Sequence, residues 1–258
     1  MVFCALFASA CGAATERWTP PEDVRADDAV VFLSSECTAV VVGERVALTA
    51  AHCVEARGPY SLRVGRRDVP VERCAVHPGA YPEPRECGAG DGRTTIAHDL
   101  AVLVLAQPAG VEPVDVLLAP PAPSRSWWVR HPVRVVGWDR RPRVVGYLGQ
   151  RAGHNRIVRM GSETFVTVPN PRDGFAPVIG DSGGPALLRI GDEERVAGVL
   201  RGTPAYGSRA SVFAATFAPA NSRWLVRTLP PELATDLAFD EREPFGEPGR
   251  PSVSAWMR

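Results

Sequence analysis

The chain has 258 residues, of which 45% are hydrophobic, 22% are charged and 7% are aromatic. Its 29 basic and 29 acidic residues give a formal net charge of zero, so the composition predicts neither nucleic acid nor an anionic membrane surface as a partner. This length and hydrophobicity allow a substantial core in one large domain or two small ones and exclude a disordered protein. The 24 glycines and 25 prolines separate short apolar runs, which is typical of all-β proteins.

The first 28 residues are expected to be an export signal and a leader arm. Residues 1–11 are apolar and then small, as at the end of an export signal, although no basic segment precedes them. The sequence around Cys11 also resembles a bacterial lipobox, in which the cysteine is lipidated, but Ala8 stands where leucine is usual. Lipidation of Cys11, which would tether the protein to a membrane, and ordinary cleavage nearby both stay open. No later stretch approaches the roughly 20 apolar residues of a membrane-spanning helix.

Residues 29–115 are expected to form a first β-barrel. Short apolar runs alternate there with turn-rich stretches, at spacings that suit a closed antiparallel barrel. The expected strands are residues 29–33, 38–42, 47–50, 61–64, 69–76 and 100–105. The proline-rich stretch 107–126 then predicts an extended connection between two packed halves.

Residues 116–229 are expected to contain this connection, a second β-barrel and a terminal helix. The expected strands are residues 133–138, 144–148, 157–160, 164–168, 185–189, 196–200 and 211–216. Residues 221–229 start with the capping pair Asn-Ser and place Trp224, Leu225 and Leu229 on one face of a short helix, which two prolines then stop. Residues 230–258 are rich in proline and glutamate and are expected to be a loosely packed or disordered tail.

The cysteines favour an oxidising compartment. If Cys4 and Cys11 leave with the signal or carry a lipid, four of the six cysteines remain, namely Cys37, Cys53, Cys74 and Cys87. Four cysteines allow three disulfide pairings, and none of the spacings is the Cys-x-x-Cys of a zinc site, so a metal is the weaker interpretation. Disulfides are expected, with free thiols as the alternative. The protein is then secreted, periplasmic or anchored to the outer face of a membrane.

Three short segments carry the residue types of nucleophilic catalysis. They are Leu-Thr-Ala-Ala-His-Cys, which contains His52, His-Asp-Leu-Ala-Val-Leu, which contains Asp99, and Gly-Asp-Ser-Gly-Gly-Pro, which contains Ser182. A serine hydroxyl needs a neighbouring base to become a nucleophile, and a histidine that serves as this base needs a carboxylate to fix its tautomer. Each segment alone also has a structural explanation, as a strand end or a turn, but together they favour catalysis.

These segments resemble the chymotrypsin or trypsin-like serine protease family, in the family's order, over residues 29–229. The resemblance implies an all-β fold of two packed six-stranded antiparallel β-barrels with a short C-terminal helix. It also implies a serine endopeptidase that cuts proteins or peptides through an acyl-enzyme, with His52, Asp99 and Ser182 as the catalytic triad and with no metal or organic cofactor. A catalytically weak or inactive binding protein with the same fold is the alternative. An esterase is disfavoured because its strand–helix nucleophile elbow is absent.

The resemblance further implies the parts that support the triad. The backbone N–H groups of Gly180 and Ser182 would form the oxyanion hole, since the glycines around the nucleophile let a substrate approach the backbone. The implied disulfides are Cys37–Cys53, which anchors the histidine loop, and Cys74–Cys87.

The expected substrate pocket departs from that of trypsins. Ala176 stands where trypsins have an aspartate at the pocket floor, so a basic substrate side chain would lack its charge partner. Thr203 and Ser211 align with the pocket walls, which favours small or medium uncharged side chains, whereas Arg201 could instead reach an acidic one. Arg201 also replaces the serine that helps to hold the triad aspartate in relatives, so reduced activity is an open alternative.

Asp181, directly before the nucleophile, is expected to support the oxyanion loop. In family zymogens this aspartate pairs with a new N terminus of the type Ile-Val-Gly-Gly, and no such sequence precedes residue 29. An unpaired buried carboxylate would distort the loop, so we expect an internal arginine, with Arg134 and Arg140 as candidates by position. Activation would then need signal removal alone. The histidines outside these motifs, His77, His131 and His154, are expected at the surface.

Overall fold

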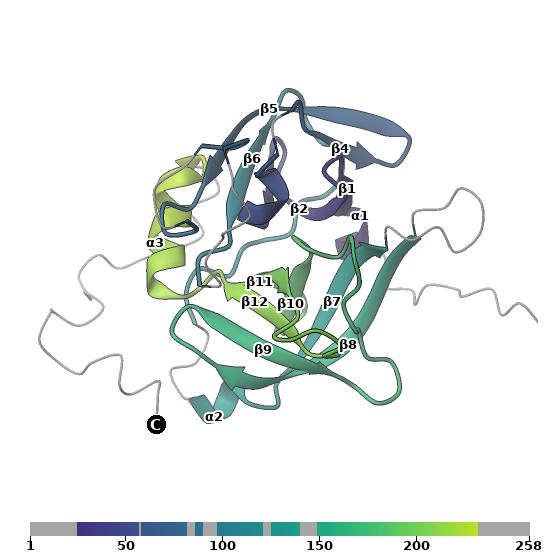
Figure 1. Ribbon diagram of the computed structural model, residues 1–258, viewed down its shortest axis with the longest axis vertical. Coiled ribbons are helices and arrows are strands. Elements are labelled where there is room, and N and C mark those ends of the chain that lie inside the picture. The colour runs from purple at the N-terminus through teal and green to yellow at the C-terminus, as the bar shows by residue number, and fades with distance from the viewer. Residues whose placement is uncertain are drawn as a thin grey trace, which may run out of the picture.

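The strands of the described residues close into two antiparallel barrels of six strands each (Figure 1). The structure is a computed structural model, and it describes residues 25–56, 58–81, 86–89, 97–120, 125–139 and 149–231. The predicted fold class is therefore confirmed. The expected signal and Cys11, the expected strand 144–148 and the expected tail after residue 231 lie outside the described residues, and the predicted domain boundaries stay a prediction.

The first barrel has the strand order β1-β2-β3-β6-β5-β4. Its strands are β1 (Val30–Leu33), β2 (Cys37–Gly43), β3 (Val46–Thr49), β4 (Ser61–Val64), β5 (Arg67–Val76) and β6 (Ala101–Leu105). All of β2 is buried, because one of its faces lines the barrel and the other faces the second barrel. A short 3-10 helix, η1 (Ala51–Val54), follows β3. The predicted strands of this half agree with these bounds to within two residues.

The second barrel has the strand order β10-β11-β12-β9-β8-β7. Its strands are β7 (Pro132–Asp139), β8 (Gly149–Met160), β9 (Thr164–Pro169), β10 (Pro185–Ile190), β11 (Glu193–Gly202) and β12 (Ser211–Ala215). Its core is aromatic, with the rings of Phe165 and Phe213 stacked at 5.0 Å. Strand β8 begins eight residues before the predicted start at residue 157, because its polar first half is held by pairing with β7 rather than by an apolar face.

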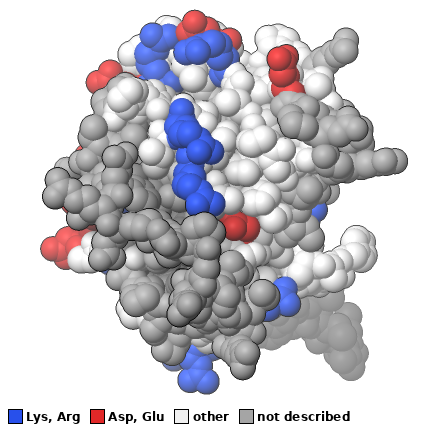
Figure 2. Space-filling model, turned by 90° about the vertical axis from the view of Figure 1, so that its left-hand side faces the viewer, with Lys and Arg blue, Asp and Glu red and all other residues white. Residues whose placement is uncertain are grey.

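Three helices complete the described chain: α1 (Arg25–Asp28), α2 (Arg125–Trp128) and α3 (Pro219–Thr228). Helix α3 starts two residues before the predicted position, because Pro219 occupies its first turn, where a missing N–H costs nothing. It packs Trp224 and Leu225 against the first barrel. No helix of the described residues has the length and apolar character of a membrane span. Figure 2 shows the side of the molecule that carries α3, where the arginines form a narrow stripe on a largely uncharged described surface.

The buried side chain of Asn221 connects α3 to both barrels. Its Nδ2 donates to the carbonyl oxygens of Ala215 at 2.8 Å and of Glu163 at 3.3 Å. Its Oδ1 lies 2.8 Å from Nδ1 of His98, in the loop before β6. One amide group thus holds β12, the β8–β9 turn and the His98 loop in one arrangement.

Replacing Asn221 with alanine should destabilise the protein by about 2 kcal/mol, because buried backbone carbonyls and an imidazole nitrogen lose their partner. Urea denaturation followed by tryptophan fluorescence measures this change. The control is Arg223→Gln at an exposed position of the same helix, which should change the free energy of unfolding by less than about 0.5 kcal/mol. Equal effects of the two substitutions would contradict the role given to Asn221.

Candidate active site

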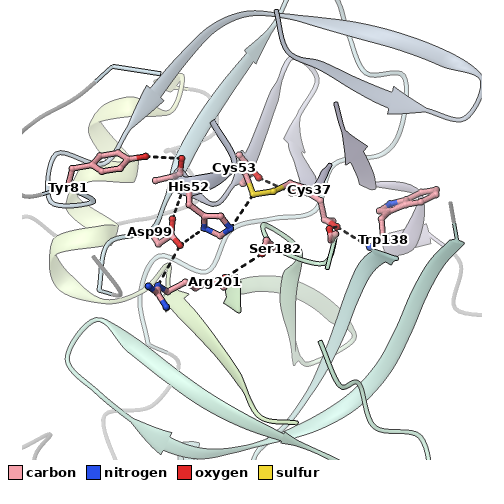
Figure 3. Close-up of a disulfide and its surroundings, with 12 residues drawn as sticks. Cys37, His52, Cys53, Tyr81, Asp99, Trp138, Ser182 and Arg201 are labelled. Carbon is pink, nitrogen blue, oxygen red and sulfur yellow. Dashed lines mark hydrogen bonds and ion pairs between the residues drawn. A yellow bond between two sulfur atoms is a disulfide. The ribbon is translucent and has the colours of Figure 1, made fainter. Parts of the chain in front are cut away.

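Strand pairing brings His52 and Asp99 together. His52 lies in η1 directly after β3, Asp99 directly precedes β6, and β3 and β6 are paired from Thr49 and Ala101. The carboxylate of Asp99 accepts a hydrogen bond from the backbone N–H of His52 at 3.0 Å and lies 2.7 Å from its Nδ1 (Figure 3). This contact favours the tautomer with a proton on Nδ1, so that Nε2 remains available as a base.

The charges around His52 make its imidazole more basic. Asp99 is fully buried, whereas the side chain of His52 is 27% exposed. Burial is the largest single influence and lowers the pKa of His52, but the hydrogen bond and the charge of Asp99 raise it, with a further contribution from Glu55. The charge of Arg201 lowers it. The balance places the pKa of His52 above its ordinary value of 6.5.

Ser182 lies in the turn between residues 180 and 184, at the start of the second barrel's β10. Its hydroxyl donates to the carbonyl oxygen of Arg201 at 3.4 Å, and Nε2 of His52 lies 3.7 Å from Sγ of Cys53 (Figure 3). Within the described part of the chain, no hydrogen bond joins Ser182 to His52. Rotation about the Cα–Cβ bond of Ser182 would redirect its hydroxyl away from Arg201.

A threonine of the first barrel holds the serine turn. The backbone N–H of Thr38 donates to the carbonyl oxygen of Ser182 at 2.7 Å, and its hydroxyl donates to the carbonyl oxygen of Gly180 at 2.8 Å. The same hydroxyl accepts the backbone N–H of Trp138 at 3.0 Å. Gly183 has φ +86°, and a Cβ there would overlap the carbonyl oxygen of Thr38, so the close approach requires glycine. Thr38 was not predicted from the sequence, where the signal for it is a polar residue in an otherwise apolar strand.

The backbone N–H groups of Gly180 and Ser182 belong to this turn. Neither donates a hydrogen bond to any described residue, whereas Asp181, Gly183 and Gly184 all do. Gly180 adopts φ +105°, which favours glycine. These two N–H groups are the ones that the sequence assigned to the oxyanion hole.

The disulfides have the expected pairings. Cys37 is bonded to Cys53 and Cys74 to Cys87. The first joins the residue before Thr38 to the residue after His52. Cys37, His52 and Cys53 lie close enough to hold a metal ion, but sulfurs in a disulfide are not thiolates and do not suit this role.

The family model described as Trypsin matches residues 23–222, which is most of the chain. The chain belongs to the trypsin family. None of the curated proteins compared with it matches. As a trypsin-family protein it is a serine-type peptidase, and proteins or peptides are its substrates.

The cation that partners Asp181 in this trypsin-family chain is Arg151. The carboxylate of Asp181 is fully buried, and its Oδ2 accepts hydrogen bonds from Arg151 at 2.9 Å and from the backbone N–H of Val178 at 2.6 Å. Arg151 also donates to the carbonyl oxygen of Ala176 at 3.0 Å, and its guanidinium lies 4.7 Å from the ring centre of Phe175. The arginine therefore supports both the carboxylate and the loop that leads to it.

The prediction that Arg134 is this partner is wrong. Arg134 is bonded to Asp27 and, at 2.6 Å, to Glu194, so its charge is neutralised elsewhere. Arg140, the other candidate, lies outside the described residues. Arg151 was missed because it lies in the polar half of β8, which the sequence did not identify as a strand.

The three residues predicted to line the substrate pocket differ in their exposure. Ala176 lies in the loop before Ser182 and Thr203 follows β11, and both are partly exposed. Ser211 starts β12 and is fully buried, and its hydroxyl has no hydrogen-bond partner among the described residues. Ala176 and Thr203 are therefore partly open to solvent, whereas Ser211 is covered.

One histidine expected at the surface is buried. His77 is 6% exposed, with its ring stacked on that of His98 at 4.5 Å and lying 5.0 Å from that of Trp224. Burial lowers the pKa of His77 to about 4, so the ring is neutral at pH 7 and packs as an aromatic. His154 is exposed, as expected, and His131 is partly exposed. No local pattern around His77 indicates that α3 covers it.

Asp181 should lower the stability of the protein at neutral pH. Burial raises the pKa of Asp181 from 3.8 to about 6, and Asp139 adds to this, although Arg151 and the Val178 N–H oppose it. Because the folded state binds this proton more tightly than the unfolded state, stability falls as pH rises from about 4 to 6. Asp181→Asn should therefore raise the free energy of unfolding at pH 8 by about 2 kcal/mol while reducing kcat/KM.

Urea denaturation at pH 8 and pH 5 tests this prediction. Near pH 5 the wild-type carboxyl is largely protonated, so the advantage of the asparagine variant should shrink there. A variant that is less stable than wild type at pH 8 would contradict the prediction.

Proposed function

We propose that this chain is a serine endopeptidase whose catalytic triad is His52, Asp99 and Ser182. The observation that carries the proposal is the buried Asp99 carboxylate, which binds both the backbone N–H and Nδ1 of His52. A catalytic histidine needs this arrangement, because the carboxylate orients the ring and stabilises the imidazolium that forms when it takes a proton.

In the proposed reaction, Nε2 of His52 takes the hydroxyl proton of Ser182 as the oxygen attacks the substrate carbonyl. The backbone N–H groups of Gly180 and Ser182 stabilise the negative charge on the former carbonyl oxygen. His52 then gives the proton to the leaving amine as the C–N bond breaks, which leaves an acyl-enzyme. A water molecule, which gives a proton to His52, then attacks the acyl-enzyme; His52 returns the proton to Ser182 as the ester bond breaks and the acid product leaves. This chemistry requires no metal or organic cofactor.

The proposed primary specificity is for small or medium uncharged side chains. Ala176 offers neither a negative charge for a basic side chain nor a positive one for an acidic side chain, and the partly exposed Thr203 narrows the space. Ser211 is fully buried and would act on the pocket only from a covered position. A peptide library cleaved by the enzyme tests this proposal, and preferred cleavage after arginine would contradict it.

We propose further that activation needs no new N terminus, because Arg151 already supplies the cation for Asp181. The segment where a zymogen cut would fall also has its own contacts. Gln150 and Trp138 donate to the carbonyl oxygen of Val30 at 3.0 and 2.9 Å, and Asp27 is paired with Arg134. A new N terminus formed between residues 24 and 32 would have to leave these contacts to reach Asp181, so finding such an end in active enzyme would contradict the proposal.

The proposed location is outside the cytoplasm, which the two disulfides support. The signal is proposed to lie within residues 1–28, with Cys11 either lipidated or removed. Mass spectrometry of the N-terminal peptide distinguishes a diacylglyceryl cysteine from an unmodified new end.

A fluorophosphonate probe should label the signal-processed protein at Ser182, because the probe reacts with an activated serine. Labelling should vanish in Ser182→Ala and fall at least 100-fold in His52→Ala, whereas Ser208→Ala, at a serine outside the proposed site, should leave it unchanged. Intact-protein mass spectrometry measures the adduct. A folded protein that resists the probe would favour the alternative of a protease-fold binding protein.

Arg151→Ala should lower kcat/KM at least tenfold, because Asp181 loses its charge partner and the oxyanion loop loses a support. Arg156→Ala, an exposed arginine on the same strand, is the matched control and should keep wild-type activity. Hydrolysis of a chromogenic peptide gives both values. Full activity in Arg151→Ala would show that another cation serves Asp181.

A further inference from the structure

We propose that Arg201 is a positioning residue of the active site, whose guanidinium reaches from the second barrel to Asp99 and opposes the charge that Asp99 directs onto His52. The inference rests on the proposed function of His52 and Asp99. In the family resemblance a serine stands here, so the arginine departs from that pattern.

The alternation of β11 directs Arg201 to the junction of the barrels. Leu200 belongs to the core of the second barrel, whereas Val199 belongs to the apolar cluster of the first. Because successive side chains of a strand point to opposite faces, the side chain of Arg201 lies on the same face as that of Val199, toward the first barrel. The pairing with β12 shifts its register between Leu200 and Gly202, so Arg201 lies at a bulge one residue before the end of β11.

The guanidinium of Arg201 lies beside the buried carboxylate without forming a hydrogen bond to it. Its Nε is 3.9 Å from Oδ2 of Asp99, the oxygen that also holds Nδ1 of His52 (Figure 3). This Nε is buried and has no hydrogen-bond partner in the described part of the chain. The side chain is 27% exposed, and its charge is permanent because arginine does not lose its proton in proteins. Arg201 therefore acts on Asp99 through its charge.

The charged groups around His52 change its pKa in opposite directions. Asp99, from the loop before β6, and Glu55, after η1, raise the pKa of His52, whereas Arg201 of β11 lowers it, as burial does. Only the neutral imidazole can accept the proton of Ser182. By favouring the neutral form, Arg201 extends the activity of the enzyme to lower pH.

A rival role for Arg201 is the binding of an acidic substrate side chain. The structure favours the positioning role, because the charge already faces Asp99 and its Nε is covered by protein. The rival predicts an effect on KM for acidic peptides alone, whereas the positioning role predicts a change of pH profile with every substrate.

The test is the pH dependence of kcat/KM for an uncharged peptide amide in wild type, Arg201→Gln and Arg201→Lys. In Arg201→Gln the midpoint of the acid limb should rise by about half a pH unit, which lowers kcat/KM about threefold at pH values below it. Arg201→Lys keeps the charge and should stay close to wild type. An unchanged midpoint in a folded Arg201→Gln variant, or an effect confined to KM for acidic peptides, would overturn the inference.

A second readout needs no turnover. NMR titration of the His52 ring in a Ser182→Ala background should show the same upward shift when Arg201→Gln is added. This measurement, taken with the activity of the wild-type protein, separates the two proposals: the shift together with a wild-type protein that cleaves no peptide would refute the proposed function and keep the inference. No shift in an active protease would refute the inference alone.

Discussion

The alignment of the two barrels depends on the hydrogen bonds of the Thr38 hydroxyl. His52 and Asp99 lie in the first barrel and Ser182 at the edge of the second, so their relative position is only as well defined as the junction. Thr38 donates to the carbonyl oxygen of Gly180 and accepts the backbone N–H of Trp138. Its own carbonyl accepts the hydroxyl of Thr49, at the end of β3. One buried residue thereby links the serine turn, the second barrel and the strand that leads to His52.

Two buried carboxylates near this junction are neutralised in different ways. Asp181 forms a direct ion pair with Arg151 at 2.9 Å, and this pair fixes a loop. Asp99 is held mainly by the N–H groups of His52, with Arg201 farther away at 3.9 Å. A hydrogen-bonded arginine would compete with His52 for the oxygen atoms of Asp99, whereas a more distant one leaves this hydrogen bond in place. The separation therefore agrees with a modulating role for Arg201.

The sequence was sufficient for the parts of the structure that depend on local pattern. Apolar runs located nearly all the described strands, and the motifs around His52, Asp99 and Ser182 placed two of these residues in direct contact. Long-range polar contacts were not predictable, because nothing in the sequence around Arg151 or Thr38 indicates a partner about 30 or 142 residues away. The prediction that His77 lies at the surface was wrong for the same reason, because the helix that buries it lies far along the chain.

Asn221 has a consequence for the order in which the protein matures. It bonds to His98, the neighbour of Asp99, and it follows Ser182 in the chain. During synthesis the first barrel emerges with His52 and Asp99 long before the helix that steadies their loop. A partly made chain therefore lacks the amide group that holds the His98 loop, and this contact forms only after α3 has been synthesised.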